Sequence, residues 1–382
     1  MYLYGCNKEM KQVSTRTDHK STFLLFVAYL QIIGIILVVM GHSVHEYPDG
    51  EGGKTLLSYR MLYSFHMPLF MFCSGLLMVF TTLRRSTLAT FPQPLKFTLN
   101  KVKRLLIPFA FLILLVYFPR ALMSFMADDE VQLSWEGMLS SFVYSDHLPI
   151  PYYWFLQASF ILLVSNYALL WIGKRMHVPD VAMFGILICI ALWMYVVVPF
   201  NTWFFALRNV CTYAIYFILG AVYGAYLERV DSVINWNSIA LFITLIVAWV
   251  VSFILFEGTK LAVVTAICGI AMAVSVAHIL ESRNIRVLDS LIGTNYIIFL
   301  LSWFFNVASQ QVLGYYTDFH WSVYSTLSLI TGVLGPVIIL KLMQRKRGTR
   351  LCRTALLLLG QAVDCDFKAK KAKEYKLDET VK

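Results

Sequence analysis

The chain has 382 residues, of which 59% are hydrophobic and 14% are charged, and its formal net charge is +10. A soluble domain carries about 25% charged residues, so this composition excludes a large soluble protein and indicates a multipass membrane protein. The basic excess does not require a nucleic-acid partner, because the cytoplasmic loops of membrane proteins are rich in lysine and arginine.

Ten apolar stretches are each long enough to cross about 30 Å of hydrocarbon. They lie near residues 23–43, 62–82, 105–125, 153–173, 179–199, 209–227, 238–257, 261–281, 288–309 and 322–342. We therefore expect an all-α integral membrane protein with about ten transmembrane helices. Residues 1–22 would form a cytoplasmic N-terminal segment, residues 23–343 the transmembrane domain and residues 344–382 a basic cytoplasmic tail.

Lysine and arginine indicate the orientation of these spans. With the N-terminus in the cytoplasm, 27 of the 32 basic residues lie on the cytoplasmic side, against five on the outer side: Lys54, Arg60, Arg120, Arg208 and Lys260. This distribution predicts that both termini are cytoplasmic. The expected location is the plasma (inner) membrane, as a multi-pass protein. The basic tail would rest on anionic lipid.

The seven cysteines are scattered and form no C-x-x-C pair, and four of them fall inside apolar runs. Cysteine in an apolar run behaves as a small hydrophobic residue. The pattern therefore predicts neither a disulfide framework nor a metal site.

The first apolar stretch carries no charge from Phe23 to Gly41 and ends in His42 and Ser43. An ionisable side chain at the end of a span is costly and is a functional candidate. Since the unperturbed pKa of histidine lies near neutrality, His42 is suited to act as a general base toward a hydroxyl group. The alternative is an interfacial histidine bonded to a loop carbonyl.

A second histidine, His66, opens the next span in the sequence FHMP, where Pro68 fits the first turn of a helix. The end of one span and the start of the next lie on the same side of the bilayer. His42 and His66 are therefore predicted to share the outer face, which suggests a common site.

The segment KFTLNKVKRLLIP, residues 96–108, precedes the third span on the cytoplasmic side and contains Lys101, Lys103 and Arg104. At α-helical spacing, Lys101 and Arg104 share a face, so the two cations can bind one phosphate group. The alternative is a stop-transfer cluster lying on lipid headgroups.

An aromatic run, PYYWFLQ at residues 151–157, opens the fourth span. Its rings match an outer interfacial belt, which is the simpler explanation. Alternatively, Trp154 stacks on a sugar and Gln157 supplies a polar group just inside the membrane, so both are candidate substrate-binding residues.

Taken in order, these segments resemble the acyltransferase 3 family of integral-membrane O-acyltransferases, and they look most like its fucose 4-O-acetyltransferase-like branch. The segments that carry the resemblance are VVMGHS, SFHMPLFMFCSGLL, NKVKRLLIP, YYWFLQASFIL, RNVCTYAIYFILGAVYG and IGTNYIIFLLSW. In this resemblance His42 matches an essential histidine, proposed to activate the acceptor hydroxyl or to carry the acyl group. Lys101 and Arg104 match an R-x-x-R pattern that is tied to the use of acyl-CoA.

The resemblance implies transfer of an acetyl or other short acyl group from cytoplasmic acetyl-CoA, or another acyl-CoA, to a hydroxyl of a cell-surface or exported carbohydrate or glycolipid, without a metal. His42 would be the base and His66 would orient the acceptor or stabilise charge. Lys101, Lys103 and Arg104 would bind the phosphates of CoA. The expected partners are the acceptor and membrane lipids, with no nucleic acid; a homo-oligomer is left open.

One position departs from the family pattern. The family often has arginine or lysine eleven positions before the first-helix histidine, where this chain has Gln31. Gln31 would lie about 16 Å from His42 along a helix axis, and its neutral amide cannot neutralise a phosphate. An inactive acyltransferase-like protein is therefore one alternative. A transporter or flippase for a polar lipid or glycan is another, although transporters place ionisable residues near the midplane and here they gather at the two surfaces.

Overall fold

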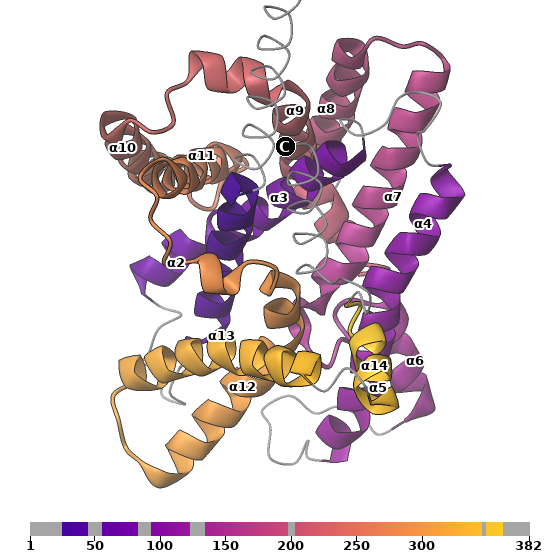
Figure 1. Ribbon diagram of the computed structural model, residues 1–382, viewed down its shortest axis with the longest axis vertical. Coiled ribbons are helices and arrows are strands. Elements are labelled where there is room, and N and C mark those ends of the chain that lie inside the picture. Colours follow the sequence, from indigo (N-terminus) through magenta and orange to yellow (C-terminus); the bar gives the residue numbers. More distant parts are fainter. Residues whose placement is uncertain are drawn as a thin grey trace, which may run out of the picture.

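The computed structural model describes residues 25–44, 56–82, 93–122, 134–197, 203–345 and 349–361. In these ranges the regular secondary structure is helical, apart from one isolated bridge between Tyr144 and Phe204 (Figure 1). The predicted cytoplasmic N-terminal segment lies outside the described residues.

Nine helices within the described ranges are long and apolar enough to cross a membrane, which confirms an all-α integral membrane protein. They are the first helix (Leu25–His42), α2 (Leu57–Tyr63) with α3 (His66–Thr82), α4 (Pro94–Lys101) with α5 (Ile107–Leu122), α7 (Trp154–Arg175), α9 (Leu207–Val233), α10 (Ile239–Phe256), α11 (Ala262–Ser282), α12 (Asn295–Tyr316) and α13 (Trp321–Arg345). The predicted fifth span corresponds to α8 (Asp180–Val197), whose apolar part is just shorter than these nine.

Two predicted boundaries differ clearly from the structure. The predicted third span, 105–125, is part of a longer helical segment that begins at Pro94, because α4 continues into α5 through the π-helix η2 (Val102–Leu106). The predicted ninth span, 288–309, begins only at Asn295. Gly293 has a φ of +82° there, and such a left-handed residue interrupts a helix.

The closest helix crossing in the core joins α3 and α9, and two glycines make it possible. A Cβ atom on Gly75 would lie 1.8 Å from the carbonyl oxygen of Phe217, and one on Gly220 would lie 2.0 Å from that of Phe72. Small residues allow such backbone contact between membrane helices, where dispersion rather than the hydrophobic effect drives packing. Because α3 begins at His66, this crossing helps to fix the position of that histidine.

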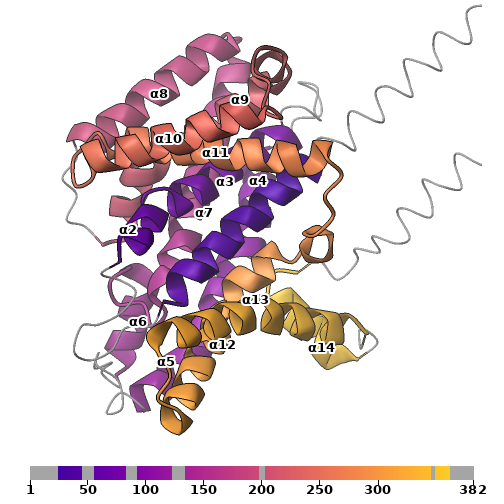
Figure 2. The same cartoon turned by 90° about the vertical axis from the view of Figure 1, so that its left-hand side faces the viewer.

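Polar contacts between neighbouring segments agree with the predicted topology. At the end predicted to be outer, they are the pairs Arg60–Glu257 and Lys260–Val196. At the end predicted to be cytoplasmic, they are Lys174–Asp180 and Arg286–Asp289. Each pair joins residues that the charge pattern places on the same side. Figure 2 shows α2 and α6 (Trp135–Val143) on the left-hand side of the molecule and α14 (Arg350–Leu358) on the right-hand side.

We expect Gly75→Ala to destabilise the protein by about 1–3 kcal/mol or more, because the new methyl group overlaps a backbone oxygen that cannot move aside. The measurement is the thermal midpoint of the detergent-purified protein. Gly185→Ala in α8 is the matched control, since nothing lies within 4 Å of its added Cβ. Alanine normally favours a helix over glycine, so this control should be neutral or slightly stabilising. Equal midpoints for the two variants would contradict the role of the crossing.

Candidate active site

The structure brings His42 and His66 together, as their positions in the sequence predict. The ring of His42 packs on Tyr152 with centroids 4.4 Å apart, and the ring of His66 meets Tyr63 edge-on at 4.5 Å. The Tyr63 hydroxyl in turn lies 3.4 Å from the carbonyl oxygen of Gly41. The two imidazoles are close enough for a charge on one to act on the other.

His66 is 1% exposed, and its two ring nitrogens have different surroundings. Nδ1 lies 3.0 Å from the carbonyl oxygen of Leu62, and because a carbonyl can only accept, Nδ1 carries the proton. Nε2 is buried and has no hydrogen-bond partner among the described residues. In the neutral ring, His66 therefore presents an unused lone pair, which is rare for a buried polar atom and suited to bind a substrate hydroxyl.

Tyr152 is a site residue that the sequence reasoning did not single out. It lies in the short 3-10 helix Pro151–Tyr153, which turns its ring inward against His42. The buried Tyr152 hydroxyl lies near Ser302 of α12 and has no hydrogen-bond partner among the described residues. The signal available in the sequence was the tyrosine pair directly before the predicted fourth span.

The two predicted substrate-binding residues contact α9 and α6. Trp154 stacks on Tyr213 of α9, with centroids 5.3 Å apart and an interplanar angle of 14°. Gln157 is fully buried and donates to the carbonyl oxygen of Phe142 in α6 at 3.1 Å. Within the described ranges, no hydrogen bond or ring contact joins Trp154 or Gln157 to the histidine pair. Their predicted role in binding substrate stays a prediction.

Amide side chains of α12 hold the end of the first helix, which the sequence reasoning also missed. Gln310 Nε2 donates to the carbonyl oxygen of Ser43 at 3.0 Å and to the hydroxyl of Ser328 at 3.3 Å. With its amide oriented to donate, Asn306 Nδ2 reaches the carbonyl oxygens of Ser302 and Ser328 at 3.2 and 2.9 Å. These bonds tie the backbone beside His42 to α12 and α13.

Of the predicted phosphate-binding cations, Lys103 and Arg104 lie in the π-helix η2, and Lys101 directly precedes it. Lys101 Nζ lies 4.9 Å from the centroid of the Phe97 ring, and the Arg104 guanidinium lies 5.7 Å from that of Tyr296. The Tyr296 hydroxyl donates to the carbonyl oxygen of Arg104. Lys103 and Arg104 are exposed, while Lys101 is half-buried.

The α-helical spacing assumed for Lys101 and Arg104 was wrong, because the helix is locally widened to π geometry between Val102 and Leu106. The two cations nevertheless remain close enough to repel each other. A single π turn within an α-helix is frequent at functional sites, because it displaces side chains from the regular spacing. In the ranges that the structure describes, no group of three or more His, Cys, Asp or Glu side chains is placed to hold a metal ion.

Helix α12 connects the two groups. Tyr296 beside Arg104 lies in its first turn, and Gln310 beside Ser43 lies near its other end. Fourteen residues of α-helix separate them by about 21 Å. The histidine pair and the cationic turn therefore lie at opposite ends of one membrane helix, as the sequence predicts.

Part of the C-terminal tail covers the cationic turn. Gly360, with φ +64°, ends the turn after α14, and a Cβ atom on it would lie 2.8 Å from the carbonyl oxygen of Arg104 and 2.9 Å from the Pro108 ring. The sequence predicted contact of this tail with lipid. The described part of the tail packs against α5 and η2; most of the basic residues of the tail lie outside the described ranges, so its contact with lipid stays a prediction.

A comparison with protein-family models matches residues 24–341 to the acyltransferase domain Acyl_transf_3. The chain belongs to the acyltransferase 3 family. This family assignment supports a membrane acyltransferase and confirms the resemblance; the fucose 4-O-acetyltransferase-like branch stays a prediction. Comparisons with curated proteins and with solved structures gave no match.

We expect Gln310→Leu in this acyltransferase domain to lower stability by about 1–3 kcal/mol, because the Ser43 carbonyl and the Ser328 hydroxyl lose a buried donor. The thermal midpoint in detergent measures this loss. Gln311→Leu is the matched control, since the Gln311 side chain is exposed on the same helix. If both variants melt like the unsubstituted protein, Gln310 does not hold the first helix.

Proposed function

We propose that this membrane acyltransferase moves an acetyl or other short acyl group from cytoplasmic acetyl-CoA, or another acyl-CoA, to a hydroxyl of an exported or cell-surface carbohydrate. The membrane would be the plasma (inner) membrane. The observation that carries the proposal is the separation of two kinds of chemistry along α12, with paired imidazoles at one end and exposed cations at the other.

His42 is the proposed base. It takes the proton of the acceptor hydroxyl while the hydroxyl oxygen attacks the thioester carbon, so that a C–O bond forms and the C–S bond breaks. The proton then passes to the departing CoA thiolate, which leaves as the thiol. His66 is proposed to orient the acceptor, because its free Nε2 can accept a hydrogen bond from a neighbouring hydroxyl of the same sugar.

The cationic turn suits the phosphates of the donor. Arg104 is exposed and offers a planar fork of donors that matches a phosphate group, and Lys103 beside it adds a second exposed cation. Lys101 is half-buried and close to Arg104, so it adds positive potential to the same turn. Tyr296 beside Arg104 and Gln310 beside Ser43 are about 21 Å apart along α12, so the thioester must extend from the cationic end into the membrane.

The alternatives make different predictions for the same site. A transporter or flippase of a polar lipid or glycan needs neither acyl-CoA nor a base, and the family assignment favours the enzyme over it. An inactive relative remains the alternative that Gln31 raises. Gln31 is half-buried in the first helix, and its amide leaves that helix without the cation of the family pattern. Turnover of acyl-CoA by the purified protein distinguishes the enzyme from both alternatives.

We expect His42→Asn to reduce kcat by about 10²- to 10⁴-fold, the usual contribution of a positioned acid or base. We expect His66→Asn to raise the KM for the acceptor about fivefold, the effect of losing one hydrogen bond of about 1 kcal/mol. Asparagine at 66 retains a donor for the Leu62 carbonyl and removes the free Nε2, so folding should be preserved. The measurement is acyl transfer from labelled acetyl-CoA to extracted glycan. His147→Asn, an exposed histidine on the predicted outer side, is the control. Full activity of His42→Asn would refute the catalytic assignment.

We expect Lys101→Gln and Arg104→Gln each to raise the KM for acyl-CoA about tenfold or more, because a charged hydrogen bond contributes about 1.5–3 kcal/mol. The KM for the acceptor should stay unchanged. Lys96→Gln removes an exposed lysine from α4 and is the charge-matched control. An equal, small effect of all three substitutions would point to general attraction by the basic surface rather than to a phosphate site.

A further inference from the structure

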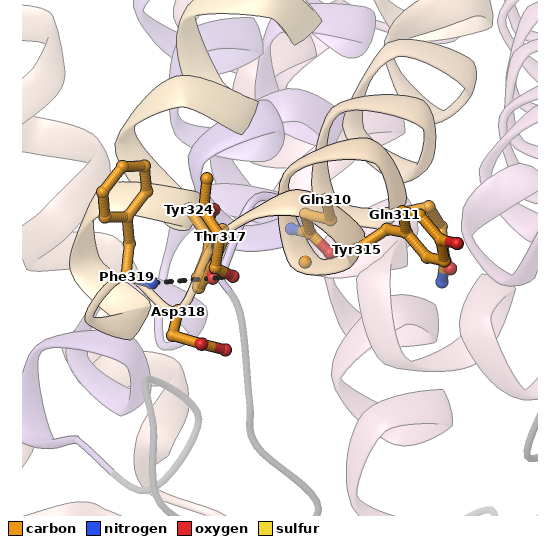
Figure 3. A pocket seen from close by; sticks show the side chains of 8 residues that line it. Gln310, Gln311, Tyr315, Thr317, Asp318, Phe319 and Tyr324 are labelled. Carbon is orange, nitrogen blue, oxygen red and sulfur yellow. Dashed lines mark hydrogen bonds between the residues drawn. The ribbon is translucent and has the colours of Figure 1, made fainter.

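A cavity of about 590 Å³ opens where α12 ends and the chain turns into α13. Its volume falls within the range of about 300 to 1,000 Å³ that is usual for small-molecule sites. Figure 3 shows Asp318 and Phe319 on one side of this region and Gln310, Gln311 and Tyr315 on the other. The cavity lies at the end of α12 that carries the histidine pair.

The turn that forms one wall is held in place by Tyr324. The buried Tyr324 hydroxyl accepts the backbone N–H of Phe319 at 2.9 Å and donates to the carbonyl oxygen of Thr317 (Figure 3). These bonds fix both sides of Asp318. The carboxylate is therefore presented from a defined backbone position rather than from a free loop.

The lining has the chemistry of a site for polyhydroxylated ligands. The Asp318 carboxylate accepts hydrogen bonds from hydroxyls, and the Gln311 amide both donates and accepts. The Tyr315 ring is 82% exposed and offers a flat apolar face with a polar tip. Among the described residues, no cation pairs with Asp318. An acidic ligand would therefore meet an uncompensated negative charge, so the lining favours a neutral ligand over an acidic one.

Gln310 links this cavity to the histidines. It lines the cavity, and its Nε2 donates to the carbonyl oxygen of Ser43, the residue that follows His42. The Gln310 side chain thus lies between the cavity and the backbone of Ser43, the residue next to the proposed base.

We propose that this cavity is the acceptor subsite and that it takes a neutral carbohydrate, whose further sugar units rest between Asp318 and Tyr315 while the reacting hydroxyl faces His42. The proposal rests on the proposed function, which it deepens by naming the site and the charge class of the acceptor.

The test measures binding without requiring transfer. Saturation-transfer NMR would be recorded on the full chain in a zwitterionic detergent that contains no sugar, with a pool of neutral gluco-, galacto-, fuco- and rhamno-oligosaccharides and a pool of uronic-acid oligosaccharides. We expect the neutral pool to bind and the acidic pool to bind at least about fivefold more weakly. We expect Tyr315→Ala and Asp318→Asn each to weaken binding of the neutral pool at least about fivefold, the effect of losing one contact of about 1 kcal/mol.

Tyr316→Ala is the matched control, because Tyr316 is the neighbouring exposed tyrosine and does not line the cavity. Unchanged binding in Tyr316→Ala supports the proposal. Equal losses in Tyr315→Ala and Tyr316→Ala, no effect of either cavity substitution, or no binding of the neutral pool would each overturn it. Acyl transfer from labelled acetyl-CoA to extracted glycan by the same samples reports on the proposed function separately. Transfer with no sugar bound at the cavity refutes the subsite alone, and sugar binding without transfer refutes the enzymatic function.

Discussion

The backbone contact between α3 and α9 is the constraint on which the site depends. Gly75 and Gly220 each place their Cα against a carbonyl oxygen of the other helix, so the crossing point has no freedom to slide. His66 begins α3, and Tyr63 lies one turn earlier in α2, where it meets both His66 and Gly41. The position of the first helix, and with it that of His42, therefore depends on the contact between α3 and α9.

Helix α12 contacts both the cationic turn and the end of the first helix, so it sets the distance between them. Its first turn packs on the cationic π turn and its last turns hold the carbonyl beside His42. A straight helix is stiff along its axis because every interior residue is hydrogen-bonded to the next turn. The distance between the two groups is thus set by the length of one element and not by the sum of several loops.

The apolar runs and the charge asymmetry were enough to predict the fold class and most of the helices, as well as the shared location of His42 and His66. Tyr152 and Gln310 were missed for a physical reason. Their importance comes from lateral packing, and Gln310 meets Ser43 across 267 residues of chain. The length of an apolar run predicts which residues cross the membrane. It does not predict which of the resulting helices are neighbours. The π turn was missed because one extra residue in a helical turn leaves no mark on an apolar pattern.

Gly360 has a practical consequence for work on this chain. The family match ends at residue 341, close to the end of α13, so the chain could be truncated there for expression. Yet Gly360 lies against the Arg104 carbonyl and the Pro108 ring, with Leu356 and Leu359 buried beside it. A chain shortened to the family boundary would expose this apolar face and remove the segment that covers the cationic turn. Affinity tags are therefore better appended beyond residue 361 than used to replace the tail.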